Sequence, residues 1–184
     1  MRTGEWSLHS LAARIVSRYM MEGADKTVLC SFFDGDVGPI LRSELRNATV
    51  SRGNYFVVYQ KDRYKEILKP VLQKSGMHRF RVFPDGTSDY AQALAGSCGL
   101  IAPAGHQSIS EALALGKPVF VIPVKGQWEQ ELNARRLRES GFGDYCYFSD
   151  LGSRLGHFLK YSDVYFENLV RAKASCTILR NGRR

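Results

Sequence analysis

The fold of this chain is decided by residues 99–143, GLIAPAGHQSISEALALGKPVFVIPVKGQWEQELNARRLRESGFG. The stretch begins with a short apolar run and a glycine turn, and then has helical periodicity over 107–115. Gly116-Lys117-Pro118 ends this helix, a β-branched run follows at 119–123, and a second helical segment covers 128–140. Strand, glycine turn, helix, strand and helix in this order are typical of parallel α/β units.

The segments on either side continue the same alternation. Pro70 is expected to kink one helix or end it early, and Ser88 or Asp89 is expected to cap the next. The pattern from residue 54 onward predicts an α/β fold, a Rossmann-like parallel sheet with helices on both faces. Strands are expected at 55–60, 79–83 and 145–148, and helices at 63–75, 89–95, about 151–159 and 162–179.

The first 37 residues do not belong to this alternation. Residues 7–21 have apolar side chains at the helical period with arginines on the opposite face, which favours a helix packed on a sheet over one lying on a membrane. Residues 26–33 (KTVLCSFF) predict a buried strand, and the turn-rich DGDVGP that follows breaks the chain. We therefore expect a remnant of another lobe at 1–37 and the main domain at 38–184.

The composition is that of a globular protein. The chain has 184 residues, a formal charge of +8 and 44% hydrophobic residues, and no apolar run near the roughly 20 residues that span a bilayer. Its basic residues are scattered without interleaved aromatics, so no nucleic-acid partner is expected, and the alternative of a peripheral contact with acidic lipid stays open. Without an apolar signal segment, a cytoplasmic location and reduced thiols are expected. The cysteines are Cys30, Cys98, Cys146 and Cys176.

Polar residues follow the apolar run at 100–103. Gly105 allows a close backbone approach or a positive φ, and the helix that begins here directs its free N–H groups toward the strand ends, where they suit a diphosphate. Ser108 adds a hydroxyl, and Glu111 lies one turn further on, where a carboxylate can accept both hydroxyls of a ribose. The same spacing is also that of a capping box, S-x-x-E, and spacing alone does not separate the two interpretations.

A second polar group follows the next strand, at the start of the helix over 128–140. Gln127, Glu129 and Gln130 lie beside the first group if the two strands are neighbours, and acidic and amide side chains can bind vicinal hydroxyls of a sugar. Acidic residues also suit any helix start. Asn133 is unusual inside a helix and could tie one loop to another. Two polar groups at adjacent strand ends favour a nucleotide-sugar site.

The whole set of motifs resembles the C-terminal, nucleotide-sugar-binding lobe of GT-B fold glycosyltransferases. The similarity is to the group that contains the UDP-GlcNAc transferase making lipid II and the UDP-glucuronosyl and glucosyl transferases. It extends more weakly to Gly38-Pro39-Ile40-Leu41-Arg42, which is similar to the linker entering the second lobe. The matching pieces are GHQSISE at 105–111, LGKP at 115–118, Pro123 and EQELNA at 129–134.

The resemblance implies a glycosyltransferase that takes a sugar from a UDP-sugar or a similar donor, needs no metal or cofactor, and passes the sugar to an unknown acceptor that could be lipid-linked. Ser108 and the neighbouring amides would hold the diphosphate, Glu111 the ribose, and Glu129 with Gln130 the sugar, while Pro84 would border the base. The implied donor-binding set is Gly105, His106, Gln107, Ser108, Glu111, Gln127, Glu129 and Gln130.

One departure from the family concerns the first lobe, of which residues 1–37 would form only the last helix and strand. That lobe supplies the acceptor pocket and the general base, so no catalytic residue is nominated in this sequence. An N-terminal lobe or a partner chain would have to supply them. The alternatives are a nucleotide-sugar epimerase of the same architecture and a non-catalytic nucleotide-sugar-binding module.

Overall fold

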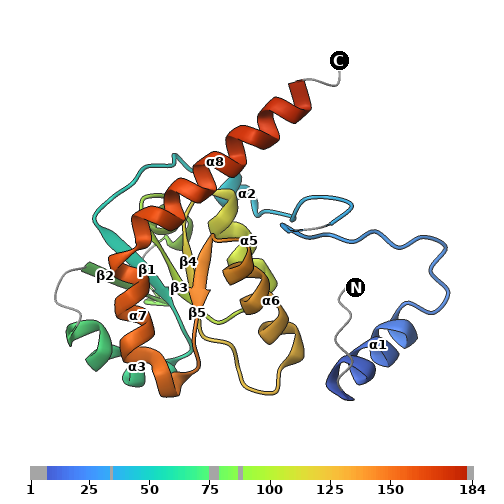
Figure 1. The fold of residues 1–184 in the computed structure, drawn as a ribbon, viewed down its shortest axis with the longest axis horizontal. Coiled ribbons are helices and arrows are strands. Elements are labelled where there is room, and N and C mark those ends of the chain that lie inside the picture. Colours follow the sequence, from blue (N-terminus) through green and yellow to red (C-terminus); the bar gives the residue numbers. More distant parts are fainter. Residues whose placement is uncertain (1–7, 34, 75–78, 87–88, 182–184) are drawn as a thin grey trace.

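The computed structural model describes residues 8–33, 35–74, 79–86 and 89–181. Its centre is a five-stranded parallel sheet in the order β2-β1-β3-β4-β5 (Figure 1). The prediction of a Rossmann-like parallel sheet is therefore confirmed. The strands are β1 (Tyr55–Tyr59), β2 (Arg79–Phe83), β3 (Gly99–Ala102), β4 (Val119–Val121) and β5 (Gly143–Tyr145).

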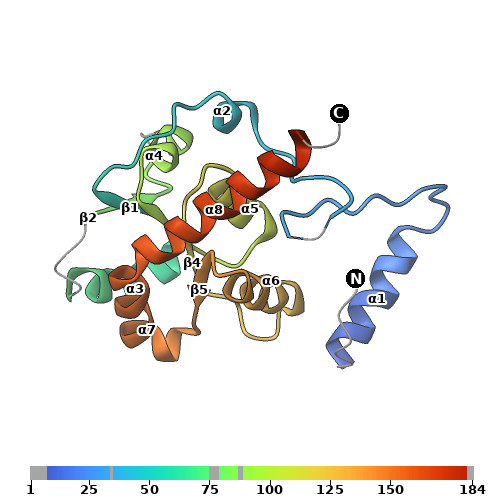
Figure 2. The same cartoon turned by 45° about the horizontal axis from the view of Figure 1, so that its top comes forward.

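Helices cover both faces of the sheet, as predicted. Figure 2 shows α3 and α7 on one side of the sheet and α2 and α4 on the other. The helix after Asp62 runs through Pro70 instead of ending there. Asp89 caps α4, accepting N–H bonds from Ala91 and Gln92, while Ser88 lies outside the described residues. The helices of this part are α2 (Ser43–Arg46), α3 (Asp62–Lys74), α4 (Tyr90–Ala95), α5 (His106–Ala114), α6 (Trp128–Glu139), α7 (Leu151–Lys160) and α8 (Ser162–Asn181).

Two buried apolar clusters hold these layers together, because successive side chains of a strand point to opposite faces. On one face Val57, Leu100 and Val119 pack with side chains of α4, α5 and α6. On the other face Phe56 and Phe120 pack with side chains of α3 and α7. Helix α8 crosses the molecule and contributes to both clusters (Figure 1). None of the helices in the described ranges is long and apolar enough to cross a membrane.

The strand predicted at 145–148 begins earlier, at Gly143. A Cβ atom at this position would lie 1.9 Å from the carbonyl oxygen of Val119, so the close β4–β5 pairing requires glycine. Apolar periodicity identifies only residues with packing side chains. It therefore missed the start of β5, where the residue needed is a glycine without a side chain.

The N-terminal segment differs most from expectation. Helix α1 (Leu8–Met20) forms as predicted, but it lies apart from the sheet beside α6, with Ile15 61% and Tyr19 78% exposed (Figure 1). The predicted strand at 26–33 is wrong: Val28 and Leu29 are exposed, and the segment has one isolated bridge, from Cys30 to Val37. No other described strand lies beside it to complete a sheet. The division of the chain at residue 37 stays a prediction.

Candidate functional site

The strand order places a crevice between β1 and β3. Helix α3, which follows β1, covers one face of the sheet, and α5, which follows β3, covers the other. The two loops therefore leave the carboxyl edge of the sheet in opposite directions. In open α/β sheets ligands bind in the opening at such a point.

Helix α5 begins at this edge with no side-chain cap. Gly105 is its N-cap residue, and in the described structure no side chain accepts a hydrogen bond from the first turn. Ser108 lies within the helix, so the capping-box interpretation of Ser108 and Glu111 is wrong. Gly105 has φ −72° and not the positive φ that was considered, and a Cβ atom there would meet nothing within 4 Å. The space beside Gly105 is therefore open, and the N–H groups and dipole of an uncapped helix start suit an anion there.

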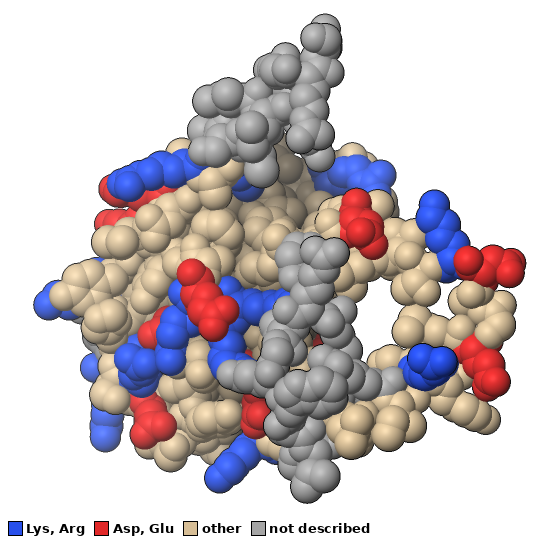
Figure 3. Space-filling view, turned by 45° about the vertical axis from the view of Figure 1, so that its right-hand side comes forward, with Lys and Arg blue, Asp and Glu red and all other residues tan. Residues whose placement is uncertain are grey.

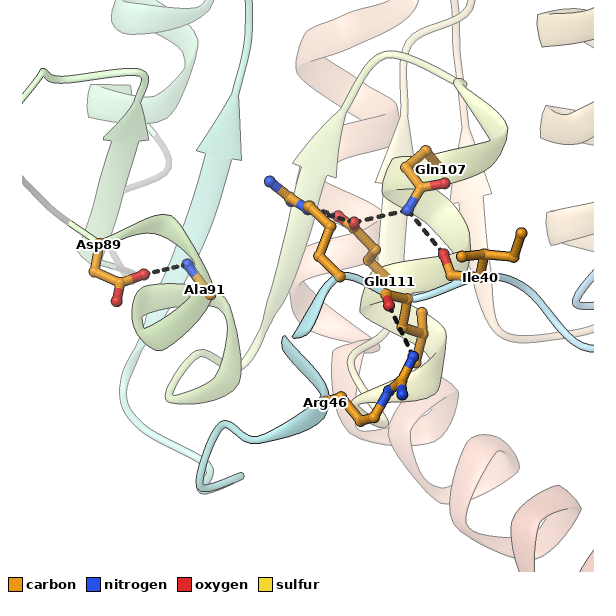
Figure 4. A network of polar contacts seen from close by, with 8 residues as sticks. Ile40, Arg46, Asp89, Ala91, Gln107 and Glu111 are labelled. Carbon is orange, nitrogen blue, oxygen red and sulfur yellow. Dashed lines mark hydrogen bonds and ion pairs between the residues drawn. The ribbon is translucent and has the colours of Figure 1, made fainter. Parts of the chain in front are cut away.

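Glu111 lies one turn further along α5 and is only 2% exposed. Arg42 donates to both carboxylate oxygens, from Nε to Oε1 at 2.8 Å and from Nη2 to Oε2 at 2.8 Å. Gln107 Nε2 also donates to Oε1, at 2.8 Å, and to the carbonyl of Ile40 at 3.1 Å. Figure 4 shows Gln107 and Glu111 directed toward one another on α5, with Ile40 approaching from the linker. The linker is thus fastened to α5 by a charged pair and an amide.

These residues line a cavity of about 420 Å³, here named the α5 cavity. Arg42 Cζ lies 5.5 Å from the centre of the Tyr90 ring, which packs edge-on against Tyr59 and Phe83. Burial, with a smaller contribution from the Glu111 carboxylate, raises the pKa of Tyr90, so its hydroxyl stays neutral. The hydrogen bond that Arg42 donates to Glu111 raises the pKa of Arg42. The lining residues are Arg42, Tyr59, Tyr90, Gln107, Ser108 and Glu111.

A second cavity, of about 650 Å³ and here named the α6 cavity, lies on the other side of the α5 N-terminus. His106 and Glu129 line it, together with Asn133 and Arg136 of α6 and four residues of the segment 29–36. His106 Nε2 lies 3.4 Å from Ser110 Oγ. The predicted set is therefore divided: Gln107, Ser108 and Glu111 line one cavity, and His106 and Glu129 line the other.

Gln127 and Gln130 stabilise the loop between β4 and α6. Gln130 Nε2 donates to Gln127 Oε1, and Gln130 Oε1 accepts from the backbone N–H of Val124 at 3.1 Å. Gln127 is exposed at the N-cap position of α6. Asn133 Nδ2 donates to the carbonyl of Ala104 at 3.1 Å, so it ties helix α6 to the loop before α5 and does not tie one loop to another as expected. Strands β3 and β4 are neighbours, so the two polar groups do share one edge of the sheet.

Three residues of the α5 cavity were missed by the sequence interpretation. The sequence patterns place Arg42 only in the stretch similar to a linker, Tyr59 in the strand expected at 55–60 and Tyr90 in the helix expected at 89–95. The positions of the two tyrosines were signals that could have indicated the cavity: Tyr59 ends β1, and Tyr90 directly follows the Asp89 cap. Pro84 does not line the cavity, and its carbonyl accepts a 2.7 Å hydrogen bond from Lys65. No group of three metal-ligating side chains was found among the described residues.

A sequence model described as "Glycosyl transferase family 1" matches residues 4–162. The chain belongs to this family. An uncharacterized glycosyltransferase of Methanosarcina mazei is 33% identical over 116 residues, which cover 60% of this chain and 28% of that protein. One of Methanosarcina acetivorans is 39% identical over 67 residues, covering 36% and 17%. The chain thus spans only about a quarter of the length of the Methanosarcina mazei protein and less of the other.

Solved glycosyltransferases have the same fold. MurG of Acinetobacter baumannii superposes with a TM-score of 0.56 at 16% identity, covering 79% of this chain and 55% of that one. LpCGTa, solved in complex with UDP, gives 0.53 at 17% identity, covering 74% and 40%. Only about half of each of these proteins is matched. The family member described here therefore has the sheet of a GT-B lobe, as the resemblance implied.

Proposed function

We propose that this chain is the donor-binding part of a glycosyltransferase and that it binds a UDP-sugar at the α5 N-terminus. The buried carboxylate of Glu111, lining a cavity beside an uncapped helix start, is the observation on which the proposal rests. A nucleoside diphosphate offers matching groups, namely a ribose diol for the carboxylate and an anion for the helix. Family membership supports glycosyl transfer as the reaction.

The two cavities suggest how the donor would lie. The diphosphate would meet the N–H groups after Gly105 and the hydroxyl of Ser108, while the ribose would reach Glu111 in the α5 cavity. The base would lie against the rings of Tyr59 and Tyr90. The sugar would extend into the α6 cavity, toward His106 and Glu129, while Gln127 and Gln130 hold the loop that precedes Glu129.

The proposed reaction is an inverting transfer. The bond between the anomeric carbon and the β-phosphate oxygen breaks, the electron pair stays on that oxygen, and a deprotonated acceptor oxygen forms the new bond. The α5 N-terminus stabilises the charge that develops on the departing diphosphate. This role can be filled by the helix and needs no metal in principle.

The acceptor side of the proposal concerns α1. Helix α1, which contacts α6 at one wall of the α6 cavity, has four apolar side chains that are 45–78% exposed: Leu11, Ile15, Val16 and Tyr19. Figure 3 shows an open ring of atoms at one side of the body, with acidic and basic side chains mixed on the same face. We propose that the apolar residues pack against an acceptor-binding lobe or partner chain. Flotation with vesicles of acidic lipid would instead indicate a peripheral membrane contact.

The donor proposal is tested by calorimetric titration of the chain with UDP, UDP-GlcNAc and UDP-glucose. Binding should be measurable, and Glu111→Ala should weaken it about tenfold or more because the charged hydrogen bonds to the diol are lost. Glu139→Ala, a matched change at an exposed position of α6, should leave the affinity unchanged. A wild-type chain that binds none of these ligands, nor ADP or GDP, would overturn the proposal. Conversion of UDP-GlcNAc into another UDP-sugar without acceptor would assign an epimerase instead.

A further inference from the structure

We infer that Arg42 is a donor-binding residue that exchanges partners: its guanidinium holds Glu111 while the site is empty and turns to the diphosphate when the ribose takes Glu111. The inference rests on the proposed function and concerns a residue of the linker, outside the polar groups at the strand ends. Among the described residues that line the α5 cavity, Arg42 is the one basic side chain.

The first step is that the pair and the ribose compete for the same atoms. Both oxygens of Glu111 accept from Arg42, and Oε1 also accepts from Gln107. The side chain of Glu111 is 2% exposed, so a diol cannot reach the carboxylate past the guanidinium. A ribose therefore binds Glu111 only when Arg42 has left it.

The second step is that Arg42 has room to move and Glu111 does not. The Arg42 side chain is 55% exposed and belongs to a linker in which Ile40 is 77% exposed, whereas Glu111 lies in a helix packed on the sheet. The guanidinium shares its cavity with Ser108, which is in the first turn of α5. A rotation of one exposed side chain thus takes the cation from the carboxylate toward the proposed diphosphate position.

The third step is charge balance. A diphosphate brought next to a buried carboxylate meets like charge, and the partial charge of a helix N-terminus, about +0.5, does not offset both. Arginine suits phosphate because its planar guanidinium donates two parallel hydrogen bonds. The exchange gives each anion a partner: the carboxylate receives two hydroxyl donors, and the diphosphate receives the released guanidinium.

The exchange predicts opposite effects of Arg42 on two ligands. A nucleoside has the diol but no phosphate, so it must break the pair and gains nothing from the released cation. Its apparent affinity is reduced by the small fraction of molecules in which Glu111 is accessible. A nucleoside diphosphate recovers the cost of breaking the pair through the new contact with Arg42.

The experiment compares uridine and UDP with the wild-type chain and with Arg42→Ala, by calorimetry or ligand-observed NMR. Arg42→Ala should bind uridine about threefold or more tightly than wild type, because the competing guanidinium is gone. It should bind UDP about tenfold or more weakly, since a charge-assisted contact is lost. If the first titrations favour ADP or GDP over UDP, adenosine with ADP or guanosine with GDP replaces this pair.

The matched control is Arg46→Ala, which removes the same charge from the same segment. Arg46 Nη2 donates to the carbonyl of Leu41 at 3.3 Å, and Arg46 is not among the described residues that line the α5 cavity, so both affinities should stay near wild type. Circular dichroism and a denaturation curve check that each variant is folded. Arg42→Lys keeps the charge without the paired donors and should fall between wild type and Arg42→Ala for UDP.

Each outcome decides between explanations. Weaker binding of both ligands by Arg42→Ala would mean that Arg42 only orients Glu111, and this overturns the exchange. Unchanged binding of both, or a change equal to that of Arg46→Ala, overturns it as well. A wild-type chain that binds none of the nucleotides overturns the proposed donor site itself, which is a separate failure from a chain that binds UDP without the reversal.

Discussion

The side-chain amide of Asn133 donates a 3.1 Å hydrogen bond to the backbone carbonyl of Ala104 and so fastens α6 to the loop between β3 and α5. Asn133 is 7% exposed and Ala104 is fully buried. Both proposed parts of the donor site depend on this contact, because the loop sets the start of α5 and α6 lines the α6 cavity.

Asn133→Ala should lower the free energy of unfolding by about 1–3 kcal/mol, since it leaves a buried carbonyl without a donor. It should also weaken UDP binding, because the turn before α5 loses its support. Urea denaturation measures the first effect and calorimetry the second. Asn54→Ala makes the same change at an exposed position and should stay within about 0.5 kcal/mol. Equal effects of the two variants would contradict a supporting role for Asn133.

Gly143 should not tolerate a side chain. A Cβ atom there would lie 1.9 Å from the carbonyl oxygen of Val119, so Gly143→Ala must separate β4 from β5 or shift their register. We expect a loss of about 3 kcal/mol or more, at the upper end of overpacking effects. The measurement is the urea midpoint of the variant.

At Gly156 the same substitution to alanine should have the opposite effect on stability. This glycine lies in the middle of α7, is exposed, and has nothing within 4 Å of an added Cβ. Gly156→Ala should therefore stabilise the chain by about 0.5–1 kcal/mol through helix propensity. Destabilisation by both changes would mean that backbone flexibility, and not the contact with Val119, governs the tolerance of these glycines.

Asp144 should contribute far more to stability than an exposed carboxylate in a similar pair. Arg138 Nε donates to Asp144 Oδ1 at 2.6 Å, its Nη2 donates to the Tyr145 carbonyl at 2.6 Å, and Asp144 is 4% exposed. Asp144→Ala should cost about 2–3 kcal/mol, because it removes one of these two hydrogen-bond partners of Arg138 and leaves a hole beside β5.

The control is Glu167→Ala. Glu167 pairs with Arg171 at 3.1 Å on α8, with both side chains more than 60% exposed. Exposed pairs of this spacing contribute about 0.3–0.5 kcal/mol, so the change should be near the limit of measurement. The same ordering should hold at high salt, which screens the exposed pair more than the buried one. A larger cost for Glu167→Ala would contradict the role assigned to burial.

Much of the sheet could be predicted because its signals are local. Tyr55–Tyr59 is a run of aromatic and β-branched residues after Gly53, and Arg79–Phe83 alternates basic and apolar residues before the turn at Pro84. The predicted limits of both strands agree closely with the structure. Asp89 caps α4 through atoms only two and three residues away. Buried parallel strands leave a continuous apolar pattern, so their existence and order along the chain needed no distant information.

The site was less predictable because its decisive contacts are distant in sequence. Arg42 and Glu111 are 69 residues apart, and no spacing rule joins a linker arginine to a carboxylate inside a helix. The same limit explains the wrong strand at 26–33, where a β-branched run found no partner strand among the described residues. Local patterns identified the polar groups near the site, but not which cavity each group lines.

Lys117 gives a prediction that depends on pH. The residue is 2% exposed, and its ammonium donates to the backbone carbonyls of Ser51 and, at 2.8 Å, Ser97. The pKa of Lys117 is lowered to about 8, chiefly by burial; the nearby Cys98 opposes this shift, and the cations of Arg52 and Lys173 add smaller contributions to it. In the unfolded chain a lysine has a pKa of about 10.4.

Between these two pKa values the unfolded chain binds a proton that the folded chain has released, so raising the pH favours the folded state. Below pH 8 both states are protonated and the contribution of Lys117 does not change with pH. Lys117→Met removes this titration together with the donors to Ser51 and Ser97. The stability difference between wild type and variant should therefore be constant from pH 6 to 7.5 and increase in favour of wild type from pH 8 to 10. Urea denaturation of both proteins across this range measures it, and subtraction removes the titrations that they share. A difference that stays flat to pH 10 would mean that Lys117 keeps its proton in the fold despite its burial.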